Sequence, residues 1–187
     1  MRWTALVPIK QGSGGKSRLS SVLSDDERCQ LAARMSRHVL AVLNQCERVA
    51  ETVILSPADL AVPETRWAQD QGRGLNPEIA AFRESFGAAP LLVIHADLPL
   101  LDTGDLDALL SEAERSGAAM ATDRAALGTN ALALADGRDF TFQFGTDSCT
   151  LHLAQDESMP VIQRTGLSAD LDTVEDIEFL RGRGVDI

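Results

Sequence analysis

The sequence predicts an α/β protein with one mostly parallel sheet and helices on both faces, on three observations. Short apolar segments typical of strands alternate along the chain with segments typical of helices. The strand predicted at 91–94 (LLVI) is apolar at every position, as expected of a central strand covered on both sides. The longest helical segment begins with a capping box formed by Ser24 and Glu27.

The predicted strands are short and are bounded by turn signals or polar loops. They are expected at 4–9, 52–55, 91–94, 118–121 and 131–134. A further half-buried strand is expected over 140–144, where three phenylalanines occupy alternate positions. Because the chain has 187 residues and shows no linker or internal repeat, a single domain over 1–187 is expected.

The predicted helices are marked by their start and stop signals. After the capping box at Ser24, apolar residues recur every four positions from 31 to 43 and form one apolar stripe. Asn76 is followed by a proline and is expected to cap a helix that runs toward Phe86. Further helices are expected from about 103 to 117, over 147–154, and after a capping pair at Thr173 and Asp176.

The composition excludes several classes of function. The chain has 28 acidic and 17 basic residues, a formal net charge of −11, and no tyrosine. This charge disfavours binding to nucleic acid or to an anionic membrane, and the shortage of aromatic residues disfavours a base-stacking platform. No apolar run has the length of a membrane span and no signal peptide is recognisable, so a cytoplasmic protein is expected.

The N-terminal segment is an exception to this acidic character. The first 20 residues contain four basic residues and no acidic one, and the loop at 10–15 is rich in glycine. Glycines let backbone N–H groups approach a phosphate, while Lys16 and Arg18 supply positive charge. A P-loop is disfavoured, because Lys10 stands where that motif needs its first glycine. We therefore expect an anion site here, with a solvated surface loop as the alternative.

Three aspartates are candidates for holding a divalent cation. Asp97 follows the strand at 91–94, so its carboxylate is expected at the carboxyl end of the sheet, where ligands bind in such folds. Asp170 and Asp172 lie two residues apart, which in extended backbone places both side chains on one side. Such hard oxygen ligands suit Mg²⁺ bound with a nucleoside triphosphate. The alternative for Asp170 and Asp172 is an ordinary pair of acids before a helix.

A second anion site is expected at the start of the helix predicted over 147–154. Free N–H groups that follow Gly145 can bind an anion there. Ser148 and His152 lie on one face of that helix and could contact the same ligand, with a purely structural histidine as the alternative. Thr129 could add a contact to a phosphate or carboxylate, or could simply belong to a turn.

Taken in order, these segments resemble those of a known family. They are Lys10 and 16–19 (KSRL), 75–76 (LN), 96–101 (ADLPLL), 128–132 (GTNAL), 144–148 (FGTDS) with His152, and 170–173 (DLDT). The set is similar to that of the 2-phospho-L-lactate and phosphoenolpyruvate guanylyltransferases of coenzyme F-420 biosynthesis. The resemblance spans nearly the whole chain. The histidine at position 95, just before the segment 96–101, departs from the family pattern and has no assigned role.

The resemblance implies a nucleotidyltransferase domain of the glycosyltransferase-A-like kind, with a Rossmann-like sheet and an antiparallel excursion. It implies that Mg²⁺, or Mn²⁺, is held by Asp97, Asp170 and Asp172. The acidic substrate would be bound by Thr129, Gly145 and Ser148, and His152, on the same helix face as Ser148, is a further candidate for this site. The GTP phosphates would be bound by Lys10, Gly14, Gly15, Lys16 and Arg18.

The implied reaction joins GTP to a three-carbon phospho-acid and releases pyrophosphate. The substrate's own phosphate oxygen is the nucleophile, so the protein supplies positioning and charge neutralisation, through Lys16, Arg18 and Asp97. Phosphoenolpyruvate is favoured over 2-phospho-L-lactate and 3-phospho-D-glycerate, and a downstream transferase that consumes the product is a conceivable partner. The alternatives are another nucleotidyltransferase of this fold, acting on molybdopterin or a sugar phosphate, and a nucleotide-sensing domain without activity.

Overall fold

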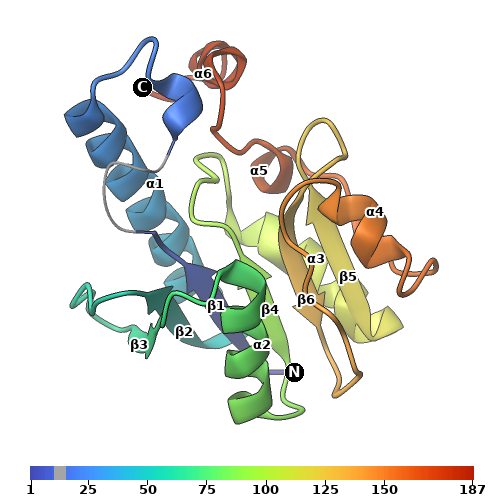
Figure 1. Cartoon of the computed structure of the whole chain (residues 1–187). Helices are drawn as coiled ribbons and strands as arrows, with labels where there is room; N and C mark the ends of the chain where they lie inside the picture. The colour runs from blue at the N-terminus through green and yellow to red at the C-terminus, as the bar shows by residue number, and fades with distance from the viewer. Residues whose placement is uncertain (11–15) are drawn as a thin grey trace.

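The computed structural model describes residues 1–10 and 16–187 (Figure 1). Within them, seven strands form one sheet in the order β3-β2-β1-β4-β6-β5-β7. Strand β6 runs antiparallel to its neighbours β4 and β5, and the other pairs are parallel. The expected α/β fold, with a mostly parallel sheet and an antiparallel excursion, is therefore confirmed.

Five of the six strands expected from the sequence form, and two more lie at the edges of the sheet. The observed strands are β1 (Trp3–Pro8), β2 (Val49–Ser56), β3 (Arg66–Gln69), β4 (Leu91–Ile94), β5 (Ala118–Thr122), β6 (Thr129–Leu134) and β7 (Val161–Ile162). The edge strands β3 and β7 are short and have no fully buried residue. They therefore lack the apolar pattern by which the central strands are recognised.

The helices with predicted caps at Ser24 and Thr173 begin where expected, whereas the helix expected after Asn76 begins before that residue. They are α1 (Asp25–Gln45), α2 (Leu75–Phe86), α3 (Thr103–Ser116), α4 (Ser148–Leu153), α5 (Thr165–Ser168) and α6 (Val174–Arg181), with a short 3-10 helix η1 (Ser17–Leu19). Capping boxes start α1, α3 and α6. Among the described residues, no helix is long and apolar enough to cross a membrane.

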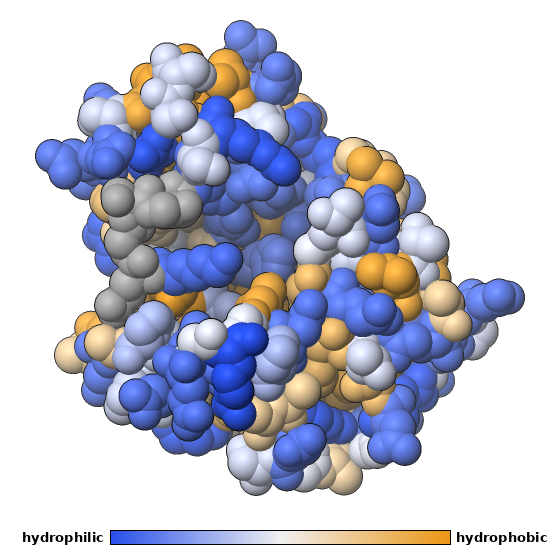
Figure 2. Space-filling model, viewed as in Figure 1, coloured by the Kyte–Doolittle hydropathy of each residue, from blue (hydrophilic) through white to orange (hydrophobic). Residues whose placement is uncertain are grey.

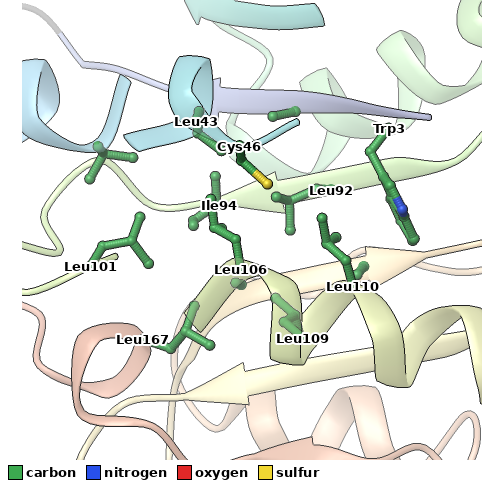
Figure 3. Packing of buried hydrophobic residues seen from close by; sticks show 14 of the residues in the cluster. Trp3, Leu43, Cys46, Leu92, Ile94, Leu101, Leu106, Leu109, Leu110 and Leu167 are labelled. Carbon is green, nitrogen blue, oxygen red and sulfur yellow. The ribbon is translucent and has the colours of Figure 1, made fainter. Parts of the chain in front are cut away.

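Helices cover both faces of the sheet, as expected (Figure 1). On one face, Leu43 of α1, Cys46 directly after that helix and Leu106 of α3 pack with Leu92 and Ile94 of β4 (Figure 3). The other face packs against α2 and α4, through a cluster that includes the apolar residues of 140–144. Burial on both faces explains why the central strands are apolar at consecutive positions.

The segment 140–144 is not a strand, which corrects the prediction made from its alternating phenylalanines. Phe142 and Phe144 are buried, so the alternation reports a real difference in burial. The backbone of Phe144 pairs with a side chain instead of with a neighbouring strand. Asn76 Nδ2 donates to the Phe144 carbonyl (3.0 Å), and the Phe144 N–H donates to Asn76 Oδ1 (2.8 Å). Asn76 therefore does not cap α2, which begins at Leu75 after Gly74.

Helix α5 approaches the loop after β4 so closely that only glycine fits at position 166. A Cβ atom there would lie 2.6 Å from the Leu100 carbonyl oxygen and would overlap the Asp105 carboxylate. Asp105 is buried, belongs to the capping box of α3, and pairs with Arg164 (Nε–Oδ1 2.6 Å). The contact sets the position of the chain that leads from α5 to Asp170.

We predict that Gly166→Ala lowers the free energy of unfolding by about 1–3 kcal/mol, because the added methyl group overpacks this contact. The matched control is Gly182→Ala, since Gly182 has a helical φ of −60° and the nearest atoms to its added Cβ lie at 3.5 Å. That change should leave stability unchanged or raise it by up to about 1 kcal/mol. Urea denaturation of both variants measures the difference, and equal midpoints would contradict the prediction.

Candidate active site

Several polar segments meet at one end of the sheet, beyond the carboxyl end of β4. The His95 N–H donates to the Asn130 carbonyl (2.9 Å), and the Leu171 N–H donates to the Asp97 carbonyl (3.2 Å). These bonds join the loop after β4 both to the start of β6 and to the segment after α5. Figure 2 shows the surface hollowed here, with hydrophilic residues around the hollow, in the region bordered in Figure 1 by η1, α6 and α2.

A lysine links two of the three candidate metal-binding aspartates. The Lys16 ammonium group donates to Asp97 and also to Asp172 Oδ1 (2.9 Å), and Arg18 Nη1 pairs with Asp172 Oδ2 (3.4 Å). The side chains of Lys16 and Asp97 are 10% and 24% exposed, so the ion pair between these two residues is largely shielded from water. Its backbone has a φ of +58°, a conformation that costs a non-glycine residue roughly 1 kcal/mol and is found preferentially at functional sites.

The pKa values in this cluster follow from burial and from the charges around each group. Burial alone would lower the pKa of Lys16, but the carboxylates of Asp97 and Asp172 outweigh it and raise that pKa. Burial alone would raise the pKa of Asp97, but Lys16 lowers it. For Asp170, burial and then the charge of Asp97 raise the pKa to about 6. The cluster therefore carries more negative charge than its basic side chains compensate.

The carboxylates of Asp97, Asp170 and Asp172 are suitable ligands for a hard cation, but they are not arranged as a metal site in this structure. The Oδ1 atom of Asp97 is buried and finds no hydrogen-bond partner in the described part of the chain. Carboxylate oxygens are the ligands that Mg²⁺ prefers. However, no group of three or more His, Cys, Asp or Glu side chains among residues 1–10 and 16–187 is placed to hold a metal ion. The ammonium group of Lys16 bonds to two of the three candidate carboxylates instead.

The two aspartates after α5 are held by different neighbours. Asn130 Nδ2 donates to Asp170 Oδ1 (3.2 Å) and to the Leu167 carbonyl (3.0 Å). The Asp172 N–H donates to Asp176 Oδ2 (3.0 Å), so the capping box of α6 also fixes the backbone of Asp172. The two side chains are thus brought near Asp97, as the sequence predicts. The capping box that fixes Asp172 is a local pattern, whereas the contact of Asn130 with Asp170 is not.

The residues expected to bind the acidic substrate form a second cluster beside the first. Thr129 and Ser148 are buried, and the Ser148 hydroxyl has no hydrogen-bond partner within the described residues. Gly145 has a φ of +124°, which favours glycine, and its carbonyl accepts the Ser148 N–H (3.2 Å). The pairing of β5 with β6 skips Asn130, and such a bulge re-aims side chains at the start of a strand.

His152 differs from its predicted role. Its side chain is fully buried, its Nδ1 lies 3.0 Å from Thr129 Oγ1, and its Nε2 accepts the Gln143 N–H (3.0 Å). Both ring nitrogens are therefore engaged by the protein, and direct contact with a ligand is not supported. The histidine instead connects Thr129 to the segment that leads to Gly145.

The remaining predicted residues belong to the N-terminal loop and the chain around β4. Lys10 is exposed at the end of β1, while Gly14 and Gly15 lie outside the described residues. His95 lies with its ring centroid 5.6 Å from that of Phe144, between the two clusters. Burial lowers its pKa, partly opposed by the charge of Asp97.

Residues 3–185 match the model of a protein family described as "Guanylyl transferase CofC like". The chain belongs to this family. The guanylyl transferase is 35% identical over 195 residues to "Phosphoenolpyruvate guanylyltransferase" of Sphaerobacter thermophilus, covering 97% of this chain and 94% of that protein. Its identity to the protein of the same name from Rubrobacter xylanophilus is 34%, with 96% and 94% covered. It is therefore an enzyme that transfers nucleotidyl groups.

Solved structures share the fold of this guanylyl transferase at low sequence identity. A nucleotidyl transferase from Methanothermobacter is 13% identical with a TM-score of 0.69, covering 97% of both chains. The 2-C-methyl-D-erythritol 4-phosphate cytidylyltransferase from Thermus thermophilus is 14% identical with a TM-score of 0.58, covering 98% of both chains. These likenesses confirm the expected nucleotidyltransferase fold.

Two residues that matter for the site were missed or misread from the sequence of the guanylyl transferase. Asn130 is a polar residue in an otherwise apolar strand, and that contrast is a signal by which it could have been found. Asn76 was expected as a helix cap, whereas its amide holds the backbone at Phe144, next to Gly145. Its partner lies 68 residues away, so no local pattern indicates the contact.

We predict that His152 makes the stability of the guanylyl transferase depend on pH. Burial lowers its pKa from 6.5 to about 4, so the unfolded chain takes up the proton first as pH falls. The stabilisation is complete above pH 6.5 and is lost between pH 6.5 and 4, by about 1–3 kcal/mol. Urea denaturation across this range should show a steeper loss for the parent than for His152→Asn. Parallel pH profiles of the two proteins would contradict this.

Proposed function

We propose that this enzyme transfers the guanylyl group of GTP to a three-carbon phospho-acid, with phosphoenolpyruvate favoured, as a step of coenzyme F-420 biosynthesis in the cytoplasm. The observation that carries the proposal is the adjacency of two clusters of polar side chains, one around Lys16 and Asp97 and one around Thr129 and Ser148. Asn130 connects them, because it follows Thr129 and donates to Asp170. The names of the relatives support the choice of substrates.

The proposed chemistry needs no protein base. A phosphate oxygen of the acid attacks the α-phosphorus of GTP and forms a new P–O bond. The bond from that phosphorus to the oxygen bridging to the β-phosphate breaks, and pyrophosphate leaves with the electron pair. Because the nucleophile is already an anion at neutral pH, no proton has to be removed from it. The protein's task is to orient two anions and to offset their repulsion.

The cluster around Lys16 supplies the positive charge in this proposal. Burial lowers the pKa of Lys16, but Asp97 and Asp172 outweigh it and raise that pKa, so Lys16 carries its charge at neutral pH. In this proposal Lys16, Arg18 and Lys10 face the triphosphate. Gly14 and Gly15, which lie outside the described residues, are expected to contribute to the same site. Asp97, Asp170 and Asp172 would hold Mg²⁺, or Mn²⁺, which when bound neutralises phosphate charge. Lys16 would then exchange its carboxylate partners for phosphate oxygens. The buried Oδ1 of Asp97, which has no hydrogen-bond partner within residues 1–10 and 16–187, supports this assignment.

The second cluster receives the acid in this proposal. The hydroxyls of Thr129 and Ser148 and the backbone at Gly145 donate to its phosphate or carboxylate oxygens. The segment 146–156 contains no lysine or arginine, so hydroxyl and amide groups provide these contacts. The product is a reactive diester of pyrophosphate, which a downstream transferase would consume.

The test is a matrix of pyrophosphate-release assays with Mg²⁺ present. Each of GTP, ATP, CTP and UTP is combined with phosphoenolpyruvate, 2-phospho-L-lactate or 3-phospho-D-glycerate. We expect release with GTP and phosphoenolpyruvate above every other combination, and none when the acid is omitted. Release with all four nucleotides alike, or with none of the acids, would contradict the proposal.

We predict that activity requires a divalent cation and that Asp97→Asn abolishes turnover while the fold is kept. The substitution removes the charge but barely changes the shape of the side chain. Asp139→Asn is the matched control, because Asp139 is exposed on the loop before Phe140. Initial rates with and without excess chelator, and circular dichroism of both variants, make the comparison. Full activity of Asp97→Asn, or of the parent in chelator, would refute the metal assignment.

We predict that Ser148→Ala weakens binding of the acid by about 1.5–3 kcal/mol, the range for a hydrogen bond to a charged group. The KM for the acid should rise by about 10- to 150-fold, while the KM for GTP changes little. Thr150→Ala is the control, since Thr150 lies on the exposed side of the same helix. Both constants are measured at saturating partner substrate. An unchanged KM for the acid would place the acid elsewhere.

A further inference from the structure

The contacts of His152 determine which of its ring nitrogens carries the proton. The Gln143 N–H points at Nε2 with an N–Nε2 distance of 3.0 Å, and a backbone N–H can only donate. Nε2 must therefore be the unprotonated, accepting nitrogen, because a proton there would face the proton of Gln143. In a neutral imidazole the other nitrogen, Nδ1, then carries the hydrogen. The low pKa of this buried ring agrees with the neutral form.

This tautomer in turn determines what the Thr129 hydroxyl can do. Nδ1 lies 3.0 Å from Thr129 Oγ1, so its N–H donates to that oxygen. The hydroxyl's own hydrogen cannot point back at a protonated nitrogen, and no other partner of Oγ1 is found in the described part of the chain. A hydroxyl that already accepts a hydrogen bond from a fixed donor presents its O–H outward as a donor. That is the polarity a phosphate or carboxylate oxygen requires.

The surroundings of His152 keep the ring in this orientation. Phe144 packs edge-on against it, with the ring centroids 5.1 Å apart, and Phe140 lies at 5.5 Å. The imidazole is fully buried, so water does not compete for either nitrogen. The ring thus connects two parts of the second cluster through its hydrogen bonds. These parts are Thr129 on β6 and the backbone of Gln143, two residues before Gly145.

We propose that His152 is a positioning residue whose Nδ1–H, fixed by the Gln143 amide, makes the Thr129 hydroxyl an obligate hydrogen-bond donor toward the acidic substrate. The inference rests on the proposed function for the identity of that substrate. The tautomer of His152 and the orientation of the Thr129 hydroxyl follow from the contacts alone. His152 itself touches no reacting atom. It acts on the acid through Thr129 and leaves the nucleotide cluster unchanged.

The first test reads the tautomer directly in the unliganded protein. Nitrogen-15 NMR of the imidazole distinguishes a protonated from an unprotonated ring nitrogen. We expect His152 to show a protonated Nδ1 and an unprotonated Nε2 at pH 7, and Thr129→Val to shift the Nδ1 resonance. A protonated Nε2, or a ring protonated at both positions, would overturn the proposal.

The second test uses two variants that each keep one of the two hydrogen bonds of His152, the bond to Thr129 or the bond from Gln143. In His152→Asn the amide nitrogen takes the place of Nδ1 and can still donate to Thr129. In His152→Gln the amide oxygen takes the place of Nε2, so it can accept from the Gln143 N–H but cannot donate to Thr129. We expect the KM for the acid to rise at least about fivefold more in His152→Gln than in His152→Asn. The KM for GTP should stay near the parent value in both. Equal effects of the two variants on the acid would overturn the proposal.

A pair of changes at position 129 separates this inference from the proposed function. Thr129→Ser keeps the hydroxyl and should restore most of the affinity for the acid that Thr129→Val loses, about tenfold or more. If the predicted tautomer is found but none of the three acids is a substrate, the result supports the positioning of Thr129 and counts against the proposed acid alone. If the acids react but Thr129→Val is as active as the parent, the positioning role is wrong and the proposed function stands.

Discussion

The structure at the end of the sheet depends on one ion cluster, in which the Lys16 ammonium group bonds to both Asp97 and Asp172. The two aspartates come from segments 75 residues apart in the sequence, and their mutual repulsion would otherwise oppose the approach of α6 to the sheet. Asp170 forms no ion pair within the described residues, and its burial, followed by the charge of Asp97, raises its pKa to about 6. The site proposed to bring two anionic substrates together thus has an excess of negative charge of its own.

The antiparallel strand β6 explains how the second cluster comes to lie beside the first. Because β6 runs opposite to β4, its first residues lie next to the last residues of β4, and the bulge at Asn130 changes the direction of the side chains there. Thr129 can therefore reach toward His152 while Asn130 reaches Asp170. In a wholly parallel sheet the start of the strand would lie at the opposite end, far from Asp97.

The sequence predicts those features that depend on local physical chemistry. The capping box at Ser24 and the apolar run at 91–94 each describe neighbouring residues, and both predictions are confirmed. The alternation over 140–144 reports burial correctly but not hydrogen bonding, because the backbone there pairs with Asn76 instead of a strand. For the same reason the sequence leaves both a ligand contact and a structural role open for His152. Its helical position is local, but its partners, Thr129 and Gln143, come from other segments.

The central claim is that two anions are joined at this site, and the identity of the product tests it most directly. The enzyme is incubated with GTP, phosphoenolpyruvate and Mg²⁺, and phosphorus-31 NMR follows the reaction. The account predicts equal amounts of free pyrophosphate and of a new species with two coupled phosphorus atoms, in which the guanylyl phosphate is joined to the phosphate of enolpyruvate. Orthophosphate and GDP, or pyrophosphate and GMP without the joined species, would contradict it.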